Sequence, residues 1–247
     1  MMDRVVAFFV DNMPSVRALL TGGPVSLLWA FACLGFAGYL KRRHRLRTGY
    51  TRKVFHFLIF FTAAACQVIG GSRALCLFGA MTSLVVFYAV LRGDGHILYE
   101  AIAREKDAPH RTYYIMVPYF ATLIGGIAAN ILFGPAAAAG YLVAGWGDAV
   151  GEPAGVRFGR HTYRVPSRRS VPTCRSYEGS AAVFVASLLA LAVAIAATPA
   201  LSFSWHSILT VPLVAVVAAL AEAVSPHGWD NATMQLVPAF LVYMVAG

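Results

Sequence analysis

The sequence predicts an all-α membrane protein with about seven or eight transmembrane helices, and its composition supports this fold class. Of the 247 residues, 59% are hydrophobic and only 13% are charged, about half the charged share of an ordinary soluble domain. The mean hydropathy is +0.66, and the apolar residues come in long blocks. A helix needs about 20 mainly apolar residues to cross the hydrocarbon core, and it satisfies its own backbone polar groups there.

Eight apolar blocks are long enough, or nearly long enough, to be spans. They cover residues 24–40, 54–69, 74–91, 113–133, 135–150, 180–201, 206–224 and 232–246. The preceding segment, 1–23, mixes charged residues with short apolar runs and lacks a signal-peptide core. We interpret it as an interfacial amphipathic segment, with a ninth span as the alternative. Residues 24–247 are expected to form a single polytopic domain.

The basic residues predict the orientation in the membrane. Most of the 20 Lys and Arg lie in three connections between blocks, which would share one face of the bilayer. These connections cover 41–53, 92–111 and 150–179. Because cytoplasmic loops carry an excess of Lys and Arg, we expect this face to be cytoplasmic and both termini to lie on the opposite side.

Most of the acidic residues fall on the same predicted face, which suggests a functional site there. Five lie at or near the ends of apolar blocks: Asp148, Glu152, Glu178, Glu222 and Asp230. Carboxylates near the hydrocarbon core are costly unless they are paired or bind a metal. A transporter would tend to place such residues at mid-membrane. A cluster at one surface instead suits a site that receives a water-soluble cofactor and a lipid substrate.

The densest group of unusual residues is the central segment 145–180. Glycine recurs every four residues, at Gly147, Gly151, Gly155 and Gly159. One interpretation is a small-residue face for close helix packing. The other, which we favour, is that Pro153 interrupts the helix and opens a glycine-rich turn whose N–H groups bind an anion. Arg157, Arg160 and Arg175 would supply the positive charge for a phosphate.

Nucleotide-binding templates of soluble enzymes are absent from the sequence. There is no G-x-x-x-x-G-K-[ST] loop, and the catalytic-loop signature of protein kinases is missing. Any phosphates would therefore be held by arginine side chains, whose planar fork matches phosphate oxygens.

The charged connection 94–111 is expected to be a solvated helix-and-turn segment, with a place at the rim of the site as the alternative.

Three separated motifs resemble the CTP-using polyprenol kinases, a family that includes phytol kinase, dolichol kinase and CTP-dependent diacylglycerol kinase. The first motif is Arg52-Lys53-x-x-His56 at the entry to an early span. The second runs from Gly147-Asp148 through Gly155-x-Arg157-Phe158-Gly159-Arg160 and continues with Ser176-x-Glu178-Gly179-Ser180. The third is Glu222 with Gly228-Trp229-Asp230-Asn231. Pro153 and Trp229 depart from the family pattern.

This resemblance implies a kinase that transfers a phosphoryl group from CTP, or from ATP, to the hydroxyl of a prenol or of diacylglycerol. Phosphoryl transfer needs Mg²⁺ and a group that accepts the hydroxyl proton, and Mg²⁺ prefers carboxylate oxygens. The implied catalytic residues are Asp148, Glu178, Glu222 and Asp230. The implied Mg²⁺ ligands are Asp148, Glu178, Asp230 and Asn231. The implied nucleotide-binding residues are Arg52, Lys53, His56, Gly155, Arg157, Gly159, Arg160, Arg175 and Ser176.

The expected partners are a nucleoside triphosphate and a membrane lipid, and no nucleic acid. Two other functions remain open. A cytidylyltransferase resembling CDP-diglyceride synthetase has a similar central region and would join CTP to phosphatidate with release of pyrophosphate. Its C-terminal motif is longer, and residues 230–235 lack the Arg and the second acid of that motif, which favours the kinase. A transporter or lipid-binding protein would act without nucleotide turnover.

Overall fold

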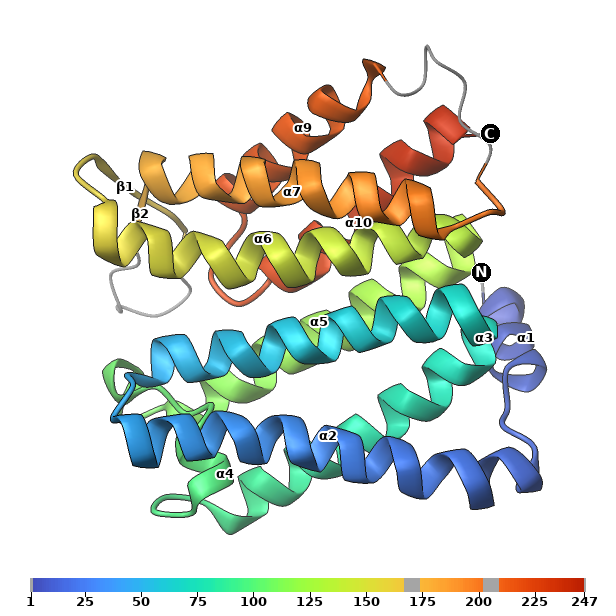
Figure 1. Ribbon diagram of the computed structural model, residues 1–247, viewed down its shortest axis with the longest axis horizontal. Helices are drawn as coiled ribbons and strands as arrows, with labels where there is room; N and C mark the ends of the chain where they lie inside the picture. Colours follow the sequence, from blue (N-terminus) through green and yellow to red (C-terminus); the bar gives the residue numbers. More distant parts are fainter. Residues whose placement is uncertain (1, 167–173, 202–208, 247) are drawn as a thin grey trace. The chain divides into compact units, whose positions relative to one another are not determined.

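The computed structural model describes residues 2–166, 174–201 and 209–246, and its regular structure there is helical apart from one short hairpin (Figure 1). The all-α fold class predicted from the sequence is therefore confirmed. The chain divides into two compact units, Met1–Thr112 and Tyr113–Gly247, which are described one at a time. The single polytopic domain over 24–247 stays a prediction.

The first unit contains two long helices. Its elements are α1 (Met2–Asp11), α2 (Val16–His44), α3 (Thr48–Arg92), α4 (Ile97–Glu100) and the 3₁₀ helix η1 (Glu105–Asp107). Within α3, Gly71 has a φ of +65°, a conformation that glycine adopts without steric cost. Figure 1 shows α3 doubling back, so the kink at Gly71 divides it into two antiparallel arms.

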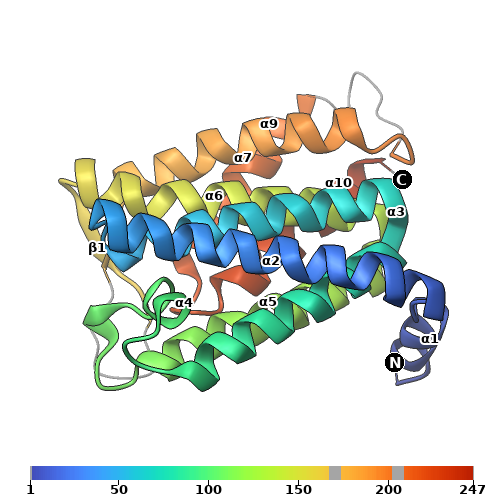
Figure 2. The same cartoon turned by 60° about the horizontal axis from the view of Figure 1, so that its bottom comes forward.

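Over its described residues, the second unit contains five α-helices and one hairpin. Its elements are α5 (Arg111–Phe133, which begins in the first unit), the 3₁₀ helix η2 (Gly134–Ala136), α6 (Ala137–Phe158), β1 (Thr162–Arg164), β2 (Cys174–Ser176), α7 (Tyr177–Ala197), α9 (Val211–Val224) and α10 (Asp230–Ala246). Helix α6 packs against α7 and α10, and α9 packs against the same two helices. Figures 1 and 2 both show α6 alongside α7. The strands β1 and β2 pair antiparallel.

Four helical segments of the described chain are long and apolar enough to cross a membrane, which indicates an integral membrane protein. They are Val16–His44, Thr48–Arg92, Arg111–Phe158 and Tyr177–Ala197. The prediction of seven or eight spans is wrong as a count. Two of the segments, of 45 and 48 residues, each combine two predicted blocks. Helix α9, with 14 residues, falls short of the roughly 17–25 that a full crossing takes, whereas α10, with 17 residues, lies at the lower limit of this range. The predicted block 206–224 begins outside the described residues.

Helix α6 continues through Pro153, so the predicted glycine-rich turn is wrong. The helix runs unbroken to Phe158, and proline is tolerated inside membrane helices because neighbouring groups satisfy the freed backbone. The repeated glycines face α7 instead. A Cβ atom on Gly151 would lie 2.6 Å from Cγ2 of Val183, and one on Gly155 would lie 2.9 Å from Oγ of Ser176. The glycine repeat therefore provides close helix packing.

The connection between α3 and α5 is packed, whereas its composition predicted a solvated segment. Tyr99 and Ala103 are buried there. Arg104 pairs with Asp107 at 2.8 Å, and these two side chains are only 4% and 3% exposed. Arg111 donates hydrogen bonds to the carboxylates of Asp94 and Glu100 and to the carbonyl of Ala103. The buried or half-buried charges of Glu100, Arg104, Asp107 and Arg111 are thus paired within this connection, which composition does not reveal.

Gly140 provides a test of the close packing between α6 and α10. A Cβ atom at this position would lie 2.2 Å from the carbonyl oxygen of Gln235, so Gly140→Ala must push two backbones apart. We expect a loss of about 1–3 kcal/mol in unfolding free energy, typical of overpacking. Gly79→Ala in α3 is the control, because its Cβ would meet nothing within 4 Å. Thermal unfolding in detergent measures both variants, and equal unfolding temperatures would contradict the packing argument.

Glu100 gives a prediction about acid stability. Hydrogen bonds from Arg111 lower the pKa of the Glu100 carboxyl. Because the folded pKa lies below the unfolded value of roughly 4.3, the ionised carboxylate stabilises the fold above that value. This contribution is lost as the pH falls through the folded pKa. Unfolding curves between about pH 6 and pH 3 should therefore fall less steeply for Glu100→Gln than for the unchanged protein. Parallel curves would refute this assignment.

Candidate active site

Arg175 is the centre of the cluster that the second unit assembles. Its guanidinium forms two ion pairs, from Nε to Oε1 of Glu222 and from Nη2 to Oδ2 of Asp230, each at 3.0 Å. The side chains of Arg175, Glu222 and Asp230 are 13%, 10% and 13% exposed. Charged groups this poorly hydrated are stable only when paired. The structure thus joins three predicted site residues that are far apart in sequence.

The two acids of this cluster come from the ends of two consecutive helices. Glu222 lies in the last turn of α9, and Asp230 is the first residue of α10. The turn between them contains Gly228 with a φ of +90°, a conformation that favours glycine. The N–H of His227 donates to the carbonyl of Pro166 at 3.1 Å, which ties the turn to the segment after β1. A carboxylate at the start of α10 is also favoured by the helix dipole.

The hairpin places Tyr163 beside Arg175. These residues are directly opposite each other in the antiparallel register, so their side chains share one face of the hairpin. The Tyr163 hydroxyl is 2.7 Å from Oγ of Ser180, and its ring centroid lies 5.2 Å from that of Tyr177. Burial raises the pKa of Tyr163, so the phenol stays protonated at neutral pH. Sequence reasoning missed Tyr163, because only the strand register relates it to Arg175.

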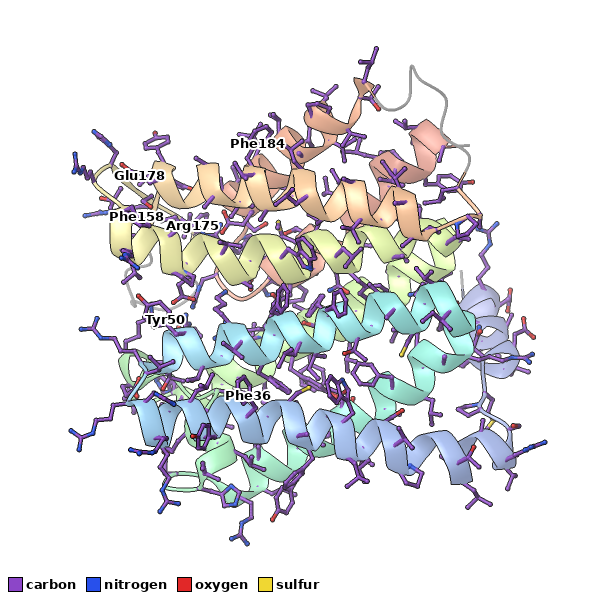
Figure 3. The ribbon with its side chains drawn as sticks, in the orientation of Figure 1. Phe36, Tyr50, Phe158, Arg175, Glu178 and Phe184 are labelled. Carbon is purple, nitrogen blue, oxygen red and sulfur yellow. The ribbon has the colours of Figure 1, made fainter. Side chains whose placement is uncertain are left out.

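Glu178 and Ser176 organise the start of α7. The Ser176 hydroxyl accepts a hydrogen bond from the N–H of Gly179 at 3.0 Å, which is the ordinary role of an N-cap serine. Glu178 lies 2.9 Å from Nδ1 of His161 and accepts a hydrogen bond from its backbone N–H. Figure 3 shows Glu178 and Arg175 at the same end of α6 and α7 as Phe158. Both predicted residues therefore have structural roles at this helix start.

Asp148 and Asn231 lie inside the helix bundle. Asp148 is on α6 and is 7% exposed, and Asn231 on α10 is 6% exposed. The amide nitrogen of Asn231 donates to Oγ1 of Thr122 at 2.8 Å, which fastens α10 to α5. Among the described residues, no group of three or more His, Cys, Asp or Glu side chains is placed to hold a metal ion. The metal roles of Asp148, Glu178, Asp230 and Asn231 stay predictions.

The other predicted phosphate ligands are exposed or pack between helices. Arg157 and Arg160 are exposed at the end of α6, and the Arg157 guanidinium lies 5.3 Å from the ring centroid of Phe158. A Cβ atom on either Gly155 or Gly159 would lie 2.9 Å from Oγ of Ser176. The three arginines therefore differ in surroundings, because Arg175 alone among them is largely buried and ion-paired.

The first motif lies in the first unit, whereas the rest of the predicted site lies in the second. Arg52, Lys53 and His56 are in the first arm of α3. Lys53 is 5% exposed, and the His56 ring stacks on Phe60 with a centroid distance of 4.2 Å. Their convergence with the cluster around Arg175 stays a prediction.

The chain is similar to the phytol kinase of Synechocystis sp., with 34% identity over 107 residues. This match covers 43% of the chain and 43% of the relative, so it spans less than half the length of the curated protein. No family model and no solved structure matches the chain. The similarity supports a distant relationship with the polyprenol kinases.

Proposed function

We propose that the protein is a CTP-dependent kinase that phosphorylates the hydroxyl group of a lipid alcohol, such as a prenol or diacylglycerol, and uses Mg²⁺. ATP is the alternative phosphoryl donor. The long apolar helices suit a lipid substrate, and the similarity to a phytol kinase favours a prenol and CTP. The cluster of Arg175, Glu222 and Asp230 supplies the charged groups that phosphoryl transfer needs.

The observation that carries this proposal is the third nitrogen of Arg175. Its Nη1 atom is buried and has no hydrogen-bond partner among the described residues. Leaving a buried donor unsatisfied costs about 1–3 kcal/mol, and more for a charged group. A phosphate oxygen would satisfy this donor with a charge-assisted hydrogen bond. An anionic substrate at this position would therefore supply the partner that the described residues do not provide.

The charge balance of the cluster favours a phosphate that arrives together with a cation. Glu222 and Asp230 carry two negative charges around the single positive charge of Arg175. A phosphate alone would be repelled, whereas Mg²⁺ neutralises phosphate charge during transfer. Mg²⁺ is usually held by one or two protein carboxylates together with substrate phosphates. The carboxylate oxygens present fit this cation, although no three of them cluster among the described residues.

The proposal assigns a role to each predicted site residue. No three of the predicted acidic Mg²⁺ ligands lie together among the described residues, so one or two of Asp148, Glu178, Asp230 and Asn231 would hold Mg²⁺ together with the substrate phosphates. Glu178 or Glu222 would accept the proton of the lipid hydroxyl. Arg52, Lys53, His56, Gly155, Arg157, Gly159, Arg160, Arg175 and Ser176 would bind the nucleotide. The basic connections would place this site at the cytoplasmic face, where CTP reaches it from water and the lipid reaches it from the bilayer.

The direct test is a product analysis with purified protein, Mg²⁺, labelled CTP or ATP, and a panel of prenols, diacylglycerol and phosphatidate. The kinase predicts a nucleoside diphosphate and a phosphorylated alcohol. Release of pyrophosphate with formation of a CDP-lipid would instead identify a cytidylyltransferase. Absence of turnover with every pair would reject an enzymatic function.

Asp148→Asn tests the site itself. We expect turnover to fall by more than about 100-fold, as for loss of a precisely placed catalytic group. Asp3→Asn makes the same chemical change on exposed helix α1 and should retain activity. Thermal unfolding and membrane extraction establish that both variants are folded. Substantial activity of folded Asp148→Asn would rule out this assignment.

A further inference from the structure

We infer that Arg175 is a positioning residue, whose guanidinium holds Glu222 and Asp230 in one fixed arrangement at the corner between α9 and α10. This inference rests on the proposed function and refines it. Sequence reasoning treated Arg175 as a phosphate ligand equivalent to Arg157 and Arg160. The structure gives it different surroundings, because two of its three nitrogens are already bound to acids of the protein.

The guanidinium of Arg175 is divided between two helices. An arginine that serves one carboxylate usually binds it with two parallel hydrogen bonds. Here Nε pairs with Glu222 on α9 and Nη2 pairs with Asp230 on α10. Because the fork is rigid and planar, it sets the distance between the two carboxylates as well as their orientation. A lysine ammonium, which is a point charge on a flexible stem, would fix neither the distance between the carboxylates nor their orientation.

Arg175 also separates two acids that repel each other. Glu222 and Asp230 are 10% and 13% exposed, so little water screens their mutual repulsion. Without a cation between them, the two helix ends would be pushed apart or the acids would turn towards solvent. Arg175 therefore offsets a repulsion that would otherwise push the end of α9 away from the start of α10.

The backbone of Arg175 is itself held on both sides. Its strand partner, Tyr163, is hydrogen-bonded to Ser180 on α7. The next residue, Ser176, caps the same helix through Gly179. The backbone that carries the guanidinium is thereby fixed to the start of α7. A fixed arginine can transmit the position of α7 to the acids on α9 and α10, and this is what distinguishes positioning from simple phosphate binding.

Steady-state kinetics separates the two roles. For Arg175→Gln we expect kcat to fall about 100-fold, the loss that accompanies a misplacement of roughly 1 Å. Loss of the Nη1 contact with a phosphate oxygen should also raise the KM for CTP, so the positioning role is read from the fall in kcat. Arg175→Lys, which can still pair with one acid, should recover part of kcat. A large rise in KM at unchanged kcat would overturn the inference, because it would make Arg175 a phosphate ligand only.

Arg164→Gln is the matched control for these variants. Arg164 lies on β1 of the same hairpin, is exposed, and the substitution makes the same change of charge. It should leave kcat and KM within about twofold of the unchanged protein, as expected for a surface substitution away from the site. A loss as large as that of Arg175→Gln would assign the effect to the net charge of the hairpin and overturn the inference.

Double-mutant cycles provide a readout that does not depend on activity. Arg175→Gln is combined with Glu222→Gln in one cycle and with Asp230→Asn in the other, and each unfolding temperature is measured in detergent. Residues in direct contact couple, so each double variant should lose less than the sum of its single losses. Additive losses in both cycles would overturn the inference. Coupling in both cycles without turnover of any substrate pair would reject the proposed function and leave the positioning role standing.

Discussion

Close approach of helix backbones through glycine is the constraint on which the second unit depends. Lipid tails are as apolar as the side chains of the helices, so helix association in a membrane relies on van der Waals packing and interhelical hydrogen bonds. Gly140 allows the backbone of α10 to lie against α6, and Gly151 allows α7 to do so near Val183. Helix α6 is therefore the common surface that sets the positions of both neighbours.

Hydrogen bonds between polar side chains reinforce this packing within the bundle. Asn130 of α5 donates to the Tyr141 hydroxyl of α6 at 2.6 Å. Gln235 of α10 donates to the carbonyl of Thr122 of α5 at 3.2 Å. Asn231, one turn before Gln235, binds the hydroxyl of Thr122. Such interhelical bonds contribute modestly, about 0.6 kcal/mol on average, but they fix which faces meet. The series ends beside Asp230, so it also fixes the start of α10.

The charged cluster is built on this rigid frame. Hairpin, helix start and helix corner each contribute one part, and Arg175 connects them through its pairs with Glu222 and Asp230. The protein thereby keeps two acids at a low exposure that neither could maintain alone. Their combined negative charge, next to a buried guanidinium nitrogen without a partner among the described residues, is the observation on which the proposed binding of a cation together with an anionic substrate rests.

Hydropathy and residue type in the sequence were sufficient to predict the helical fold class and the long apolar helices, and they singled out Arg175, Glu222 and Asp230 as candidate site residues. They did not predict that α6 passes through Pro153 or that Tyr163 lies beside Arg175. Periodicity and composition report local preference, whereas these features depend on neighbours. Arg175 and Asp230 are 55 residues apart in the chain, and only the packing of α6, α7, α9 and α10 brings such residues into contact.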